Sequence, residues 1–325
     1  MALLGRRMSK LRWAGALTLL LVLALLSLFI GAVPVTLHDL LTDPQGQQLL
    51  LVSRLPRTLA AILAGGALAV SGQIMQILAR NRFVEPMTAG AGQSAALGIL
   101  IAALFFPATA IWAKMGIAAC TTLIGSAGLL VLIRSLPLTQ PLLVPLVALV
   151  YGGVIGAFTT FFAYQGDMMQ FLGAWMTGEL SGVLQGRYEL LWVGAGAAAL
   201  TWFIADRITV LSLGENAARG LGLNVGAVTA AGLVAVSLTT AMVVVTLGAI
   251  PFVGLVVPNI VARRMGDNLR QALPVAAWSG AVLVLAGDML GRVMRAPFEI
   301  PVASLVGVAG AGVFLVLLYS EPRHD

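Results

Sequence analysis

The sequence predicts an all-α polytopic membrane protein with about ten transmembrane helices and both termini in the cytoplasm. Of its 325 residues, 59% are hydrophobic and 10% are charged, and the mean hydropathy is +0.99. In soluble domains about a quarter of the residues are charged. The apolar runs approach the roughly 20 residues that a helix needs to cross a bilayer, and they lack the alternation of a membrane barrel. We therefore treat residues 1–325 as a single transmembrane domain.

The first predicted element is a basic tail, residues 1–12, followed by an apolar run from Trp13 to Val33. A secretory signal peptide is the alternative interpretation of this pattern. However, the run is longer than the apolar region of a signal peptide, and no small-residue cleavage motif closes it. We expect a first span that follows a cytoplasmic tail.

Nine further spans follow from the remaining apolar runs, and the distribution of basic residues orients them. The spans are expected at 55–79, 88–106, 112–133, 141–164, 188–206, 225–247, 250–265, 274–292 and 301–319. With this assignment, thirteen of the 19 basic residues fall on the cytoplasmic side: Arg6, Arg7, Lys10, Arg12, Arg80, Arg82, Arg134, Arg207, Arg219, Arg263, Arg264, Arg270 and Arg323. The positive-inside rule therefore places both termini and the loop 206–224 in the cytoplasm.

Within that loop, residues 211–223 (LSLGENAARGLGL) form a short polar helix candidate between two apolar runs. Ser212 and Glu215 have the spacing of a capping box, and Glu215 stands four residues before Arg219, the favourable order for an ion pair. Gly220 and Gly222 offer left-handed positions that end the helix. Such a short helix is unstable alone in water. It must lie against its own protein, as a connector, or against a partner.

Two pairs of arginines lie on the side that the positive-inside rule disfavours. Arg54 and Arg57 begin the second span, and Arg292 and Arg295 end the ninth. A single arginine at a span end often snorkels to lipid headgroups. Two pairs together predict a basic rim for acidic residues of an extracytoplasmic partner, which would guide encounter and orientation.

Proline and glycine interrupt two segments of the chain. One is 81–98, which opens the third span, and the other is 248–267, which contains Pro251 and Pro258. Interrupted helices at membrane depth are tolerated where they are buried in protein or line a cavity. We expect both segments in the protein interior.

Several kinds of chemistry lack the residues they need. The only lysines are Lys10 and Lys114, so no P-loop is present, and the lone Cys120 supports neither a disulfide within the chain nor a metal cluster. One acidic residue, Asp288, falls inside a predicted span. A carrier driven by protons or sodium needs intramembrane ionisable groups. We interpret Asp288 instead as a buried carboxylate paired with an arginine or a hydroxyl, and we expect no enzymatic activity in this chain.

Five motifs in order resemble the permease subunits of ABC importers for iron–siderophores, haem and cobalamin. The resemblance runs from about residue 13 to 320. The motifs are RLPRTLAAILAGGALAVSGQIMQ (54–76), NRFVEPMTAG (81–90), LSLGENAARGLGLNV (211–225), FVGLVVPNIVARRMGDNLRQALP (252–274) and GDMLGRVMRAPFEIPVASLVG (287–307).

The resemblance implies a multi-pass permease of the bacterial inner membrane that works with three kinds of partner. These are cytoplasmic ATPase subunits, an extracytoplasmic substrate-binding protein and a second permease, identical or paralogous. ATP and magnesium would bind the ATPase, and no cofactor is expected in this chain. The resemblance assigns coupling to the ATPase to Ser212, Leu213, Gly214, Glu215, Ala218, Arg219, Leu221 and Gly222.

By the same resemblance, Arg54, Arg57 and Arg292 dock the binding protein, whereas Arg295 has no firm counterpart. An inner gate is implied at Pro137, Leu138, Thr139 and Gln140. Many members of this family have histidine after the eighth-span proline. This chain has Asn259, as in permeases that are similar to it and carry catecholate-type siderophores.

The expected function is therefore import of a ferric siderophore by alternating access, driven by ATP on a partner. The main rival is a proton-coupled secondary carrier that uses Asp288. A membrane-bound scaffold is the second rival. Uncoupler sensitivity would favour the carrier, and vanadate sensitivity would favour the importer.

Overall fold

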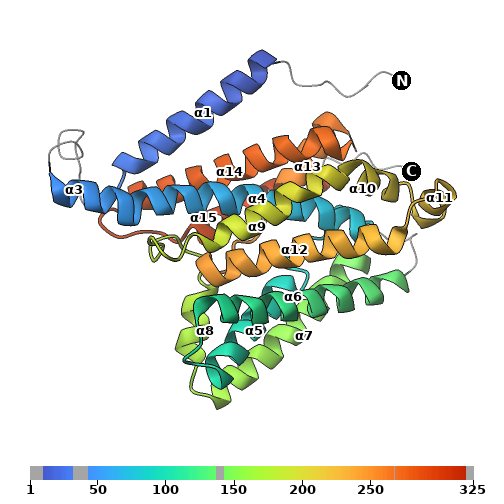
Figure 1. Cartoon of the computed structure of the whole chain (residues 1–325), viewed down its shortest axis with the longest axis horizontal. Helices are drawn as coiled ribbons and strands as arrows, with labels where there is room; N and C mark the ends of the chain where they lie inside the picture. The colour runs from blue at the N-terminus through green and yellow to red at the C-terminus, as the bar shows by residue number, and fades with distance from the viewer. Residues whose placement is uncertain (1–9, 32–42, 137–142, 267, 320–325) are drawn as a thin grey trace.

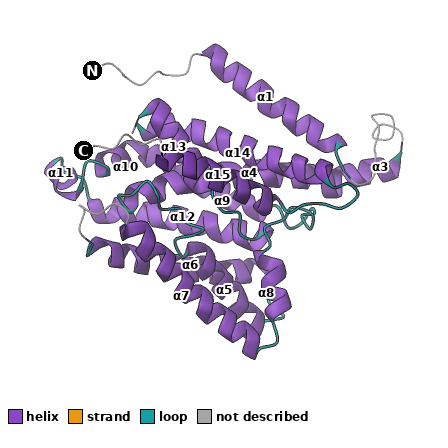
Figure 2. Ribbon diagram, turned by 180° about the vertical axis from the view of Figure 1, so that it is seen from behind, coloured by secondary structure: helices purple, strands orange, loops and turns teal. Residues whose placement is uncertain are grey.

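The computed structural model describes residues 10–31, 43–136, 143–266 and 268–319, and these residues form helices and turns without a strand (Figure 2). The helices that match the ten predicted spans are α1 (Lys10–Phe29), α4 (Leu55–Leu78), α5 (Ala91–Phe105), α6 (Ile111–Arg134), α7 (Leu143–Gln165), α9 (Leu190–Leu200), α12 (Val225–Leu247), α13 (Val253–Met265), α14 (Leu269–Met294) and α15 (Val302–Tyr319). Shorter helices are α3 (Pro44–Leu49), α8 (Met169–Met176), α10 (Ala205–Leu211) and α11 (Glu215–Gly220).

Seven helical segments of the described residues are long and apolar enough to cross a membrane, and α5 and α15 are shorter apolar helices. The remaining predicted span, the eighth in chain order, is α13, which contains Pro258 and two arginines in its last turn. The prediction of an all-α protein with about ten membrane helices is therefore confirmed.

Two spans extend beyond their predicted bounds. The second begins at Pro44 and continues through α3 and a π-helical turn, Leu50–Arg54, into α4. Its start follows from sequence, because Asp43 accepts a hydrogen bond from the Gln45 N–H and proline suits the first helical turn. The sixth continues from α9 through a 3₁₀ turn, Thr201–Ile204, into α10.

Helix α4 occupies the centre of the bundle. It packs against α14, α13, α12 and α9, while α5, α6 and α7 form a group on the other side of α12 (Figure 1). In the most apolar window of α4 and its extension 78% of the residues are buried, against 6% for α1. Helix α1 leans on α14, where Trp278 Nε1 donates to the Ala16 carbonyl at 2.8 Å.

Glycines set the closest helix crossings. A Cβ on Gly72 of α4 would lie 2.0 Å from the carbonyl oxygen of Gly254 in α13, and one on Gly65 would lie 2.2 Å from that of Gly280 in α14. Small residues of this kind let backbones meet in membrane proteins. They explain how α4 is enclosed by its neighbours.

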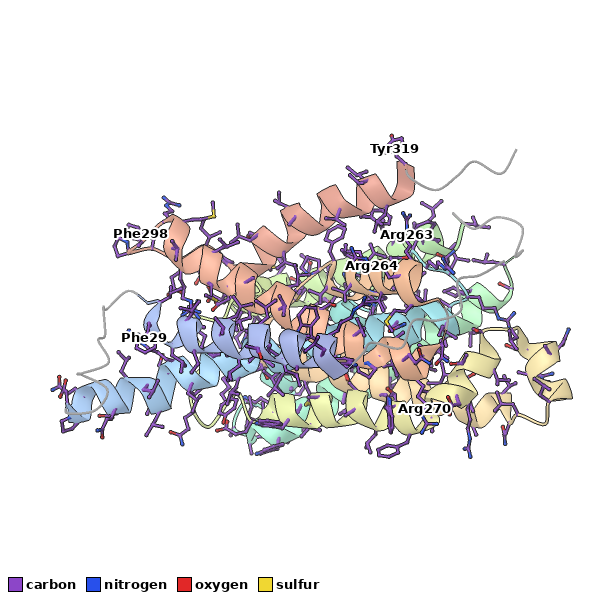
Figure 3. The ribbon with its side chains drawn as sticks, turned by 90° about the horizontal axis from the view of Figure 1, so that it is seen from above. Phe29, Arg263, Arg264, Arg270, Phe298 and Tyr319 are labelled. Carbon is purple, nitrogen blue, oxygen red and sulfur yellow. The ribbon has the colours of Figure 1, made fainter. Side chains whose placement is uncertain are left out.

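The bundle has two distinct ends. Helix α11 projects from one end, and α3 lies at the other (Figure 1). Seen from above, Arg263, Arg264 and Arg270 lie toward the α11 end, whereas Phe29 and Phe298 lie toward the α3 end (Figure 3). The first residue of α1 and the last of α15 lie toward the α11 end, so the described ends of the chain share one side.

Candidate functional site

The connection from α10 to α11 departs from the predicted capping box. Helix α11 begins at Glu215, and its N-cap is Gly214 with φ 104° and no side-chain cap. The Ser212 hydroxyl donates instead to the Thr209 carbonyl at 2.7 Å. The physical reason is that α10 continues to Leu211, so Ser212 closes the preceding helix rather than opening the next.

The apolar residues in and around α11 are divided between the protein interior and its surface. Ala218 is fully buried, whereas Leu213 is 67% and Leu221 is 68% exposed. Gly222 has φ 80°, and the chain turns there into α12 as the sequence predicted. The same prediction is wrong for Gly220, which is the last residue of α11 and keeps a helical conformation. Ala218 thus packs α11 against its own protein, and the two leucines that flank the helix are exposed.

Glu215 is the polar centre of this element. Its Oε1 lies 2.8 Å from Nη2 of Arg80 and its Oε2 lies 3.4 Å from Nη2 of Arg219. The predicted pair with Arg219 is confirmed. Arg80, which follows α4, was missed, because nothing in the local sequence indicates that the two loops meet.

Two cavities flank α11. One of about 700 Å³ separates it from the ends of α4, α6 and α7. The other, of about 430 Å³, lies between α4, α13 and the α10–α11 turn. Lining residues include Arg80 and Glu215 in the first and Gln73, Ser212 and Pro258 in the second. Helix α11 is therefore packed less tightly than the bundle that it joins.

At the α3 end, Arg57 joins two acidic residues from the far end of the chain. Its Nη2 lies 2.7 Å from Asp288 Oδ1, and its Nη1 lies 2.8 Å from Glu299 Oε2. Arg292 lies 2.7 Å from the other Asp288 oxygen. The interpretation of Asp288 as a buried, paired carboxylate is confirmed, since its side chain is only 2% exposed.

The expectation of an exposed basic rim is wrong for Arg54 and Arg292. Both are 6% exposed. Arg54 donates to the Leu28 carbonyl at 2.6 Å, and Arg292 donates to the Ser27 carbonyl and hydroxyl at 2.9 and 2.6 Å. The reason is that α1 packs against these helices and supplies acceptors that the local sequence does not reveal. Arg295 is exposed.

The interrupted segments meet in the interior, as expected. Glu85 is fully buried, and its Oε1 accepts the N–H of Phe252, a residue with φ 68°, at 3.0 Å. Asn259 donates to the carbonyls of Arg82 and Leu255 at 2.8 and 2.7 Å. Glu85 therefore joins the loop after α4 to the start of α13, and Asn259 joins the same loop to the middle of that helix. The implied gate residues Pro137, Leu138, Thr139 and Gln140 lie outside the described residues.

The fold and these two polar ends define a polytopic membrane transport protein. The FecCD transport family model matches residues 19–320. The chain belongs to the FecCD transport family, and it is a multi-pass protein of the bacterial inner membrane.

Similar proteins cover nearly the whole chain. The petrobactin import system permease protein YclN of Bacillus subtilis is 39% identical over 94% of this chain and 97% of its own length. The ferric-anguibactin transport system permease protein FatD of Vibrio anguillarum is 39% identical over 90% and 93%. A solved inward-facing structure of a metal-chelate type ABC transporter has a TM-score of 0.78 at 26% identity, covering 95% of this chain and 98% of that one.

Proposed function

We propose that this chain is the permease of an ATP-driven importer, that α11 is its contact with a separate ATPase, and that a ferric siderophore is its cargo. The observation that carries the proposal is the tip of α11, where Leu213 and Leu221 are exposed beside the charges of Glu215 and Arg219. Exposed apolar residues grouped with polar ones are typical of protein interaction sites. Family membership supports the same assignment.

Siderophore cargo is supported by the relatives, two of which are named for petrobactin and anguibactin. Asn259 is the basis of the narrower proposal that the chelate is of the catecholate type. Two permeases would enclose the pathway, with Thr139 and Gln140 at its inner gate. ATP and magnesium would be held by the ATPase.

The α3 end would receive the extracytoplasmic binding protein. The proposed docking role requires that the arginines exchange their partners within this chain for acidic residues of the binding protein when it binds. These arginines are Arg54, Arg57 and Arg292. Glu299 is the most accessible of these partners, at 27% exposed against 2% for Asp288. An acidic residue of the binding protein would therefore replace Glu299 beside Arg57 first.

The test is to change Leu213 and Leu221 together to serine and to measure co-purification with the co-expressed ATPase. Because both side chains are exposed, we expect the melting temperature of the permease to stay within 2 °C, on the order of a 0.5 kcal/mol change. Retained ATPase should fall about tenfold, equivalent to about 1.4 kcal/mol. An exposed arginine on α10 provides the control, Arg207→Gln, which should retain the ATPase. Full retention by the double variant would contradict the proposal.

A further inference from the structure

Arg80 has a left-handed backbone conformation, which is usually adopted by glycine. Its φ is 50°. Its N–H donates to the Ile77 carbonyl at 3.0 Å, and the Asn81 N–H donates to the Gln76 carbonyl at 2.9 Å. These two bonds define a Schellman motif at the end of α4, in which glycine is the usual residue at the left-handed position. A residue with a Cβ is strained there.

The side chain of Arg80 is directed to α11. Its Nη2 lies 2.8 Å from Glu215 Oε1, and both residues line the 700 Å³ cavity behind α11. Among the ion pairs of the described residues, this one joins α11 to α4. Apart from this pair, α11 packs mainly against its chain neighbours α10 and α12. Arg80 therefore links the loosely packed α11 directly to the central helix of the bundle.

A contribution to stability does not account for this arrangement. The side chains are 36% and 27% exposed, and ion pairs at such sites stabilise folded proteins little. Glycine in place of arginine would also remove the backbone strain. The main effect of Arg80 is therefore to set the position of α11, and not to raise the free energy of unfolding.

We propose that Arg80 is a positioning residue for energy coupling: its ion pair with Glu215 holds α11 away from the cavity and transmits displacement of α11 to α4. This inference rests on the proposed contact between α11 and an ATPase. When the ATPase moves α11, the pair passes that movement to α4 and so to α13 and α14, which pack on it. Without the pair, α11 moves into the cavity and α4 stays in place.

The decisive variant is Arg80→Gly, purified with the ATPase and the binding protein and reconstituted in liposomes. The readouts are retained ATPase, melting temperature, ATP hydrolysis, and uptake of ⁵⁵Fe-labelled ferric petrobactin per ATP hydrolysed. We expect the ATPase to be retained and the melting temperature to be equal or higher, because the strain is relieved. Uptake per ATP should fall at least fivefold. Deuterium exchange of residues 213–222 should accelerate, and this readout does not depend on the chelate.

Two further variants separate the ion pair from the backbone. The exchange Arg80→Glu with Glu215→Arg restores opposite charges, and it should recover at least half of the uptake per ATP that Arg80→Glu alone loses. The control is Arg270→Gln, which removes an ion pair with Asp206 between α14 and α10 without touching α11. It should leave uptake per ATP unchanged.

Each outcome bears on one claim. Wild-type protein that retains no ATPase, or shows no ATP-dependent uptake, would overturn the proposed function. If the wild type is active, unchanged uptake per ATP and unchanged deuterium exchange in Arg80→Gly would overturn the role of Arg80. A double variant no better than Arg80→Glu alone would overturn the ion pair as the cause.

Discussion

Arg292 shows how this apolar chain accommodates charge in its interior. Its guanidinium contacts Asp288, and it also donates to the Ser27 hydroxyl and to two carbonyl groups of the α1 end. Asp288 in turn contacts Arg57, which reaches Glu299. Two arginines and two acidic residues thus balance each other, so each charge of this network faces an opposite charge.

Removing one member of this network should destabilise the protein. For Arg292→Ala we expect a loss of about 3–5 kcal/mol in the free energy of unfolding, because Asp288 loses one of its two cations in a buried site. Thermal unfolding in detergent micelles measures this change.

The exposed Arg295 is the matched control for that experiment. Arg295→Ala should change the free energy of unfolding by less than about 0.5 kcal/mol. Equal melting temperatures for the Arg292 and Arg295 variants would show that the network does not hold the α3 end together.

The sequence predicted part of this network and could not predict the rest. Asp288 was expected to be paired, because an isolated charge inside a span is unfavourable. The burial of Arg54 and Arg292 was not expected. Arg57 and Glu299 are 242 positions apart, and α1 meets Arg292 across 265 positions. Neither local spacing nor the positive-inside rule carries information about contacts at such separations.

At the scale of elements, the crossing of α4 and α13 holds the interrupted segments in place. The Gln76 amide donates to the carbonyls of Gly254 and Leu255 at 3.4 and 3.5 Å, beside the contact between Gly72 and Gly254. Glu85 receives the N–H of Phe252 at the start of the same helix. The interruption before α13 is thus stabilised by hydrogen bonds with polar groups of α4 and of the loop that follows α4.

This crossing predicts an unusual sensitivity to one methyl group. Gly72→Ala would place its Cβ 2.0 Å from the Gly254 carbonyl oxygen, so the two helices must move apart. We expect destabilisation of about 1–3 kcal/mol, as for other overpacked sites, measured as a lower melting temperature.

The comparison is Gly153→Ala in α7, where no atom lies within 4 Å of the added Cβ. That change should be neutral or stabilising by about 0.5–1 kcal/mol, because alanine is the better helix former. A Gly72 variant as stable as the Gly153 variant would contradict the close packing of α4 and α13.

Helix positions were easier to predict from the sequence than helix ends. The apolar runs located the ten spans, since each run is long enough to specify a helix by its length and composition. The capping box failed because α10 continues to Leu211 and takes Ser212 for its own end. The left-handed Arg80 could not be predicted, because its position is one that sequence rules reserve for glycine.

At the scale of the whole molecule, the two ends of the bundle have different properties. The α3 end is fixed by buried ion pairs, and the α11 end carries cavities and a projecting helix. Helix α4 runs between them and packs against four neighbours. A displacement of α11 can therefore reach the ion-pair network at the α3 end through one central helix, as the proposed alternating access requires.

The competing mechanism is proton-coupled transport through Asp288. That carboxylate contacts both Arg57 and Arg292, so it is held within the ion-pair network at the α3 end. The two mechanisms differ in their source of energy, so one measurement separates them.

That measurement is uptake of ⁵⁵Fe-labelled ferric petrobactin by liposomes that contain this permease, its ATPase and its binding protein. Energy coupling through α11 predicts uptake that requires ATP, stops with vanadate and continues when an uncoupler dissipates the proton gradient. Uptake that the uncoupler abolishes while ATP is maintained, or that proceeds without the ATPase, would contradict it.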